Sequence, residues 1–267
     1  MATLTRHGGR VKFCLHIQKS ELNAAESCQG RGMTRRTADE TRSLILEAAI
    51  QLLLERGVTA GVQHVRLQEV LRIVGLTTGA AYRIWTDQDD FHRDLAVAMV
   101  GVRFAPPVTS ANIAIRDILA ANGPLVEVVR AAALDQVTYS SKFHLEPESR
   151  DSHAFITALA LRTAAGAWPE LRAASAVRHR DSIDAFAGLY GALMRHYGRR
   201  MREPLTIVDF TEAMAALGEG FAIRAAEGLN HPTYEVPEGA EVPSGQWTLF
   251  GLSILGMIEG FTVPVDE

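Results

Sequence analysis

From Thr37 to Phe261, apolar residues recur at three- and four-residue intervals, in segments that end at glycine or proline. In the first of these segments Ile45, Ala49 and Leu52 fall on one face of a helix, together with Ala48 and Leu53. Few segments combine β-branched residues with apolar–polar alternation, and aromatic residues make up only 7% of the chain. The sequence therefore predicts an all-α fold.

Capping residues, glycines and prolines set the ends of the predicted helices. Thr37 and Glu40 have the spacing of a capping box, and Gly57 is expected to end the first helix. Thr86 is the expected N-cap of a later helix, which ends before Pro106 and Pro107. Further helices are predicted over residues 113–121, 125–139, 153–165, 170–201, 206–228 and 247–261, with a loop over 230–245.

The distribution of charge divides the chain into three parts, and the net charge of the whole chain is −4. Residues 1–32 contain five basic and two acidic residues, residues 33–103 contain nine of each, and residues 104–267 contain 13 and 20. An acidic C-terminal part repels the phosphates of DNA, so any contact with nucleic acid is expected near the N-terminus. We predict one domain over residues 33–103 and a second, helical domain over 104–267.

Residues 1–32 show no sustained periodicity. They are expected to be a disordered basic arm. Alternatively, because the residue pattern changes at Met33, translation is expected to start at Met33, and residues 1–32 are then an over-annotated start. The only cysteines, Cys14 and Cys28, lie here with His16, and their spacing matches no zinc pattern, so no metal site is predicted. Two cysteines also exclude a disulfide-stapled secreted fold.

No stretch of the sequence is both long and apolar enough to be expected to span a membrane. The nearest candidate, residues 242–258, is uncharged but is interrupted by Pro243, Gly245 and Gln246. The N-terminus lacks the continuous apolar segment of a signal peptide. We therefore expect a cytoplasmic protein without a membrane partner.

Residues 67–85 have the pattern of a helix-turn-helix. Gly75 permits the left-handed backbone of a tight turn between one helix from Leu67 to Val74 and a second helix that Thr77 caps. The side chains expected to lock the two helices together are Leu67, Val70, Leu71, Val74, Ala81, Ile84 and Trp85. Small residues at the start of the second helix would let its backbone approach a DNA major groove closely.

The wider run resembles the N-terminal domain of the TetR family of transcriptional regulators, over about residues 37–100. The motifs that match are Arg42 to Ala49, Leu54 to Gly57, Val74 to Tyr82, Trp85 and Gln88 to Phe91. The resemblance implies an all-α, homodimeric repressor that binds a double-stranded DNA operator. It also implies that a small-molecule effector, bound by the helical C-terminal domain, releases the repressor from the operator.

By match to the recognition helix of that family, the residues expected to contact DNA are Thr77, Thr78, Gly79, Ala80, Tyr82 and Arg83. Arg66 at the start of the preceding helix, Gln88, and an arm formed by Arg35 and Arg36 are expected to add contacts. Gln88 stands where the family usually has a phosphate-binding lysine, Trp85 stands where phenylalanine is usual, and the link over 57–65 is longer than usual. The alternative is that Arg66, Arg72 and Arg83 are solvated helix charges.

Two apolar stripes near the C-terminus predict a dimer interface. The first stripe consists of Phe210, Met214, Leu217 and Phe221, and the second of Trp247, Gly251, Ile254 and Ile258. Ser253, Gly256 and Gly260 leave a flat side on the last helix, which suits close packing into a four-helix bundle. A two-fold dimer also fits a palindromic operator, whereas the alternative is that these helices pack within one chain.

Aromatic residues of the C-terminal part are the candidates for an effector pocket: Tyr139, Phe143, Phe155, Trp168, Phe186 and Tyr190. His144 beside Glu146, and the polar run 178–181, have no accompanying catalytic triad, metal pair or phosphate loop. No catalytic site and no cofactor are therefore predicted. The predicted function is a dimeric DNA-binding regulator; the alternative is a helical enzyme or interaction module whose helical hairpin only packs.

Overall fold

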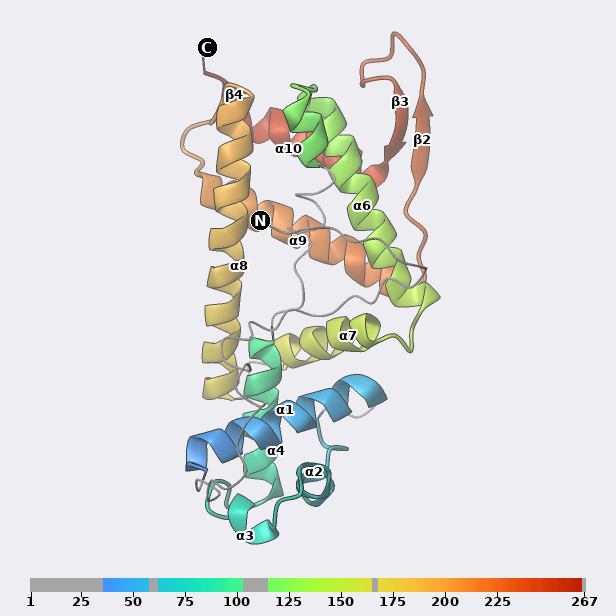
Figure 1. The fold of residues 1–267 in the computed structure, drawn as a ribbon. Coiled ribbons are helices and arrows are strands. Elements are labelled where there is room, and N and C mark those ends of the chain that lie inside the picture. The colour runs from blue at the N-terminus through green and yellow to red at the C-terminus, as the bar shows by residue number, and fades with distance from the viewer. Residues whose placement is uncertain (1–35, 58–61, 103–114, 165–167, 266–267) are drawn as a thin grey trace, which may run out of the picture. The chain divides into compact units, whose positions relative to one another are not determined.

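The computed structural model describes residues 36–57, 62–102, 115–164 and 168–265. Its first helix, α1 (Ala38–Arg56; Figure 1), begins with the predicted capping box. The hydroxyl of Thr37 accepts a hydrogen bond from the Glu40 N–H at 3.1 Å, and the Glu40 carboxylate accepts one from the Thr37 N–H at 2.8 Å. Gly57 ends the helix, as the sequence predicts, with φ 71° and ψ −176°.

Three helices follow: α2 (Leu67–Val74), α3 (Thr78–Ala81) and α4 (Gln88–Gly101). Gly75 has the predicted left-handed conformation, with φ 68° and ψ 31°, and turns the chain from α2 towards α3. Thr77 is the N-cap residue of α3, although its side chain makes no capping hydrogen bond. The prediction that Thr86 caps α4 is wrong. Asp87 caps it instead, because its carboxylate accepts the Asp90 N–H at 2.8 Å.

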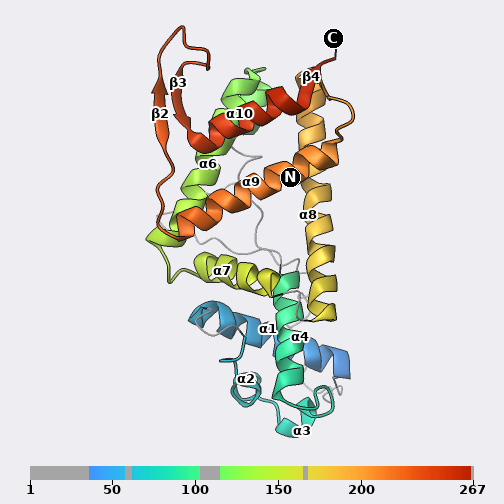
Figure 2. The same cartoon turned by 180° about the vertical axis from the view of Figure 1, so that it is seen from behind.

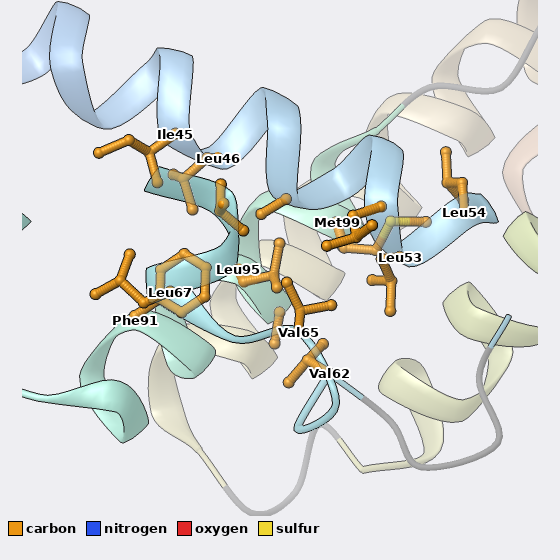
Figure 3. Close-up of a cluster of buried hydrophobic side chains, with 14 of the residues drawn as sticks. Ile45, Leu46, Leu53, Leu54, Val62, Val65, Leu67, Phe91, Leu95 and Met99 are labelled. Atoms are coloured by element: carbon orange, nitrogen blue, oxygen red, sulfur yellow. The ribbon is translucent and has the colours of Figure 1, made fainter. Parts of the chain in front are cut away.

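These four helices share a hydrophobic core, part of which is drawn in Figure 3. Ile45, Leu53, Phe91 and Leu95 are fully buried in it. Ala81 and Trp85 are also buried, while Val74 and Ile84 pack against the cluster, so the predicted inner face of the α2–α3 hairpin is confirmed. Three residues from later helices, Ala154, Leu161 and Leu171, complete the cluster.

The rest of the described chain is mostly helical, which agrees with the predicted class (Figures 1 and 2). Residues 115–120 are helical. The longer helices are α6 (Leu125–Leu145), α7 (Arg150–Thr163), α8 (Pro169–His196), α9 (Ile207–Ala226) and α10 (Leu249–Phe261). A second hydrophobic cluster joins α6, α8, α9 and α10, with Trp247, Phe210 and Phe250 buried at its centre. Thr37–Glu267, which includes both clusters, forms one compact unit.

Four short strands correct the helix limits predicted for the C-terminal half. Strand β1 (Arg199–Met201) pairs antiparallel with β4 (Thr262–Pro264), where helix was predicted up to residue 201. Gly198 adopts a positive φ of 60° just before β1, so the helix ends at His196.

The region predicted as a loop over residues 230–245 belongs to a β-hairpin, whose strands lie at its two ends. β2 (Thr233–Val236) pairs with β3 (Gly245–Thr248), and Trp247 lies in β3 instead of the last helix. That helix begins later because the Thr248 hydroxyl caps it, accepting the Gly251 N–H at 3.0 Å.

Several sequence predictions fall outside the described residues. These are the arm or early start over 1–32, the cysteines with His16, Arg35, and the boundary at Pro106 and Pro107. Among the described helices, none combines the length and the apolar composition that crossing a membrane requires.

The two glycines that end α1 and α2 should respond differently to alanine. A Cβ atom on Gly57 would lie 2.8 Å from Nε2 of His153, whose ring is held by a contact of 2.8 Å from Nδ1 to the Leu54 carbonyl. Gly75 has open space around it. We expect Gly57→Ala to lower the free energy of unfolding by about 3 kcal/mol and Gly75→Ala by about 1 kcal/mol.

Equilibrium urea unfolding of the two variants and the wild type measures this difference. The larger loss at Gly57 has two causes, a backbone conformation reserved for glycine and a collision with a held side chain. Equal losses in the two variants would contradict the proposed collision with His153.

Candidate functional site

Most of the residues predicted to contact DNA lie together on the outer side of α2 and α3. Thr77, Thr78 and Gly79 are exposed, and Ala80 is half-buried. Tyr82, just after α3, is 63% exposed, although it is an aromatic residue beside a hydrophobic core. Arg66 and Arg83 are exposed as well. We refer to Arg66, Thr77, Thr78, Gly79, Ala80, Tyr82 and Arg83 as the α2–α3 surface.

A hollow of about 470 Å³ opens on this surface. Arg66, Thr78 and Tyr82 line it, together with Asp87 and Gln88 at the start of α4. The hollow therefore brings the start of α2, the start of α3 and the residue after α3 to one place, as the sequence pattern requires of a joint contact surface.

Arg66 and Arg83 of the α2–α3 surface differ in their partners from Arg42 and Arg56 of α1. Arg56 is paired with Glu69, and Arg42 with Asp94. Arg66 and Arg83 make no ion pair with any residue that the structure describes. Their guanidinium groups are thus available to a partner such as phosphate, with no internal bond to break.

Gln88 has an internal role that its place in the predicted site did not suggest. Its side-chain oxygen accepts the Leu67 N–H at 3.1 Å, and its nitrogen donates to the Val65 carbonyl at 2.9 Å. The same nitrogen lies 2.6 Å from Nε2 of His92. Gln88 therefore joins the first residue of α4 to the first residue of α2, which leaves its amide little capacity for an external contact.

A second hollow, of about 570 Å³, lies among α6, α7, α8, α9 and α10, and we call it the C-terminal cavity. Its size is within the range of small-molecule sites, and most of its lining is apolar. Five of the six aromatic residues proposed for an effector pocket line it: Tyr139, Phe143, Phe155, Phe186 and Tyr190. The sixth, Trp168, packs against the N-terminal core instead, because it precedes α8 next to the buried Leu171.

The aromatic side chains of the C-terminal cavity form two groups. Phe143 of α6 and Phe155 of α7 are stacked, with ring centroids 4.2 Å apart, and Tyr139 meets Phe143 edge-on at 5.4 Å. Tyr190 of α8 meets Phe210 of α9 edge-on at 5.5 Å. These edge-to-face and stacked contacts fix the rings in place, so the cavity has stiff walls.

Burial changes the acidity of Tyr139 and Tyr190, two of the three tyrosines in this lining. It raises the pKa of Tyr190 to about 12, because the charged phenolate would lose its hydration. Burial also raises the pKa of Tyr139, and the charge of Asp151 adds to the effect. Both hydroxyls are therefore protonated at neutral pH and act as hydrogen-bond donors.

The residues predicted to form a dimer interface are largely buried within their own chain. Phe210, Met214, Trp247, Gly251, Ile254 and Ile258 are buried, and Leu217 and Phe221 pack against the same cluster. A side chain that already lies in its own core has little surface left for a second subunit, so this burial favours the alternative that these helices pack within one chain. Four of these residues also line the C-terminal cavity: Phe210, Met214, Ile254 and Ile258.

Sequence reasoning missed the contribution of α8 to the cavity beyond Phe186 and Tyr190. Leu189, Leu193 and Met194 complete a lining stripe on this helix. The signal was present in the sequence, because these positions continue the helical spacing from Phe186.

Arg178 links the C-terminal cavity to the end of α4. It lines the cavity from α8, and its Nη1 donates to the carbonyls of Val100 at 3.0 Å and Val102 at 3.1 Å. The last carbonyls of a helix lack partners within the helix, and a cation at this end also interacts favourably with the helix dipole. Arg178 thus caps the helix whose other end is joined to α2 by Gln88.

No protein-family model and no curated protein matches the chain. Within the described ranges, no three histidine, cysteine, aspartate or glutamate side chains come close enough together to hold a metal ion. The functional argument therefore depends on the α2–α3 surface, on the C-terminal cavity and on the contacts between them.

Proposed function

We propose that this chain is a DNA-binding transcriptional regulator of the TetR type, whose C-terminal cavity binds a small effector. The observation that supports it best is the sorting of side chains in the α2–α3 hairpin. Ala81 and Trp85 are buried, whereas Tyr82 and Arg83, which lie between them in the sequence, are exposed, and Tyr82 lines the same hollow as Arg66. An exposed tyrosine beside a hydrophobic core, next to arginines that make no ion pair with a described residue, suits contact with an external partner better than packing alone.

In this proposal the start of α3 enters the major groove. Thr77, Thr78 and Gly79 are small enough for the backbone to come close to the bases, and Tyr82 reaches a base edge or a phosphate. Arg66 and Arg83 neutralise phosphates on either side. The neutral charge of residues 33–103 is compatible with this role, because the contact depends on a local surface.

The effector would act on DNA binding through α4. A ligand in the C-terminal cavity contacts the wall that contains Arg178, and Arg178 holds the carbonyls at the end of α4. At the other end of α4, Gln88 holds the first residue of α2, next to Arg66. Displacing α4 would therefore move α2 relative to α3 and change the α2–α3 surface.

We also propose a homodimer, since two-fold symmetry would present two α2–α3 surfaces to a palindromic operator. The half-sites should lie about 34 Å apart, or a multiple of that distance. The contact would have to use residues outside the buried stripes, such as the exposed Gly256 and Gly260 of α10. Light scattering at micromolar concentration tests this, and a monomer would contradict it.

The salt dependence of DNA binding tests the function itself. The purified full chain would be used to select fragments of genomic DNA, and the affinity for a selected duplex would be measured by fluorescence anisotropy. For about six phosphate contacts, raising the salt from about 50 to 200 mM should weaken binding roughly 10³-fold. Arg66→Ala should make this dependence less steep, by about one unit in the slope of log K against log salt.

Arg224→Ala is the matched control, because Arg224 is also an exposed helical arginine but lies near the end of α9. Its salt dependence should equal that of the wild type. A protein that selects no duplex, or whose affinity does not respond to salt, would show that the hairpin is only a packing element.

A further inference from the structure

We propose that the C-terminal cavity takes a neutral, mostly apolar ligand that places a hydrogen-bond acceptor at the hydroxyl of Tyr190. The inference rests on the proposed function only in calling this ligand an effector. The chemical class of the ligand follows from the apolar lining of the cavity, from the charges in that lining and from the Tyr190 hydroxyl.

The arginine side chains in the lining of the cavity are already engaged. Arg162 is paired with Glu219, and the pair is partly open to solvent. Arg178 donates to the end of α4, and Arg199 donates to the Thr262 hydroxyl at 2.7 Å from Nε. An anionic ligand would therefore have to leave its water and break one of these contacts to find a cation.

A cationic ligand meets the same difficulty. Asp151 lies in the first turn of α7, where a carboxylate is stabilised by the helix dipole, and it is exposed to solvent. Asp181 and Glu219 both have interactions within the protein. The charges of the lining thus balance one another, three arginines against three carboxylates, and favour a ligand with no net charge.

Tyr190 provides the polar group that such a ligand would meet. Its ring is fixed between Phe186 and Phe210, and its hydroxyl lines the cavity without a hydrogen-bond partner among the residues that the structure describes. Tyr197, seven residues later and just after the end of α8, also lines the cavity, but its hydroxyl donates to the Gly123 carbonyl at 2.9 Å. A ligand that accepts a hydrogen bond without carrying a charge, such as a ketone, matches both the Tyr190 donor and its apolar surroundings.

Competition between four naphthalenes of similar size tests the proposal on the full chain. The fluorescent probe is N-phenyl-1-naphthylamine, which is neutral, and the competitors are 2-acetylnaphthalene, 2-ethylnaphthalene, 2-naphthoate and 2-naphthylmethylammonium. We expect the ketone to compete at least tenfold better than the anion and the cation. It should also compete about fivefold better than the ethyl compound, because only the ketone accepts a hydrogen bond.

Tyr190→Phe should remove the fivefold advantage of the ketone and leave the ethyl compound unchanged. Tyr197→Phe, in which the lost hydroxyl is one already bonded to the protein, should leave the order of all four competitors as in the wild type. Thermal unfolding of both variants confirms that they fold.

Three results would overturn the inference: no displacement of the probe, strongest competition by a charged naphthalene, or an equal loss for the ketone and the ethyl compound in Tyr190→Phe. Failure of the proposed function gives a different result. A chain that prefers the ketone through Tyr190 but binds no duplex DNA keeps the ligand class and loses the regulatory role.

Discussion

Trp85→Ala should lower the free energy of unfolding by about 3–5 kcal/mol and abolish DNA binding with it. Trp85 is only 3% exposed, and its ring meets Phe91 edge-on with centroids 5.2 Å apart. Its Nε1 donates to the carboxylate of Asp94 at 2.9 Å, and Asp94 also binds Arg42 of α1. The substitution leaves a cavity between α1, α3 and α4 and removes a partner of Asp94, which equilibrium urea unfolding would detect.

The neighbouring positions Tyr82 and Arg83 should show the opposite behaviour. Both are exposed, so Tyr82→Ala and Arg83→Ala should change the free energy of unfolding by no more than about 0.5 kcal/mol. DNA binding should weaken all the same. A lost phosphate contact should weaken binding to all sequences evenly, whereas a lost base contact should cost about 1–3 kcal/mol and relax specificity at one position.

The three variants together test the assignment of faces on the α2–α3 hairpin. If Arg83→Ala unfolds the protein while Trp85→Ala leaves its stability intact, the buried face is wrongly identified. If all three fold normally and bind the selected duplex like the wild type, the α2–α3 surface has no part in DNA binding.

Features set by neighbouring residues could be predicted from the sequence. The capping box at Thr37, the end of α1 at Gly57 and the left-handed turn at Gly75 each depend on residues within a few positions. The inner face of the hairpin follows from helical spacing alone, which is why Trp85 was identified as a core residue although the family that the sequence resembles usually has phenylalanine there.

Features set by distant partners could not be predicted. Arg199–Met201 becomes a strand because it pairs with Thr262–Pro264, about 60 residues later, and neither segment has the alternation of a strand. One local feature also could not be predicted: Thr86 and Asp87 are both good caps, and in the structure the Thr86 hydroxyl donates to the Asp90 carboxylate while the Asp87 carboxylate accepts the Asp90 N–H.

The candidate site shows the same limit in another form. Periodicity identified Phe210, Met214 and Ile254 as apolar faces of their helices, but it does not tell what covers such a face. In the folded chain these faces cover one another and line the C-terminal cavity, which favours intramolecular packing over the expected subunit contact. The aromatic residues Tyr139, Phe143 and Phe155 were assigned to a pocket by composition, and their shared cavity required the folded arrangement of α6 and α7.

Arg178 offers the sharpest test of communication between the cavity and the DNA-contact surface. Binding of an effector and of an operator is reciprocal: if the ligand weakens DNA binding, DNA must weaken ligand binding by the same factor. We expect the selected duplex to weaken binding of N-phenyl-1-naphthylamine to the wild-type protein about tenfold.

In Arg178→Met this factor should fall below about twofold, because the methionine keeps an apolar stem in the cavity wall but no longer donates to Val100 and Val102. Arg199→Met is the matched control. Arg199 also lines the cavity and also donates hydrogen bonds, but its partners are Thr262 at the start of β4 and Glu259 of α10, not α4. The control should keep the tenfold effect of DNA on the probe. If both variants lose the tenfold effect, the coupling between the cavity and the α2–α3 surface results from a general destabilisation of the C-terminal helices. If neither variant loses it, the hydrogen bonds of Arg178 to the end of α4 do not carry the coupling.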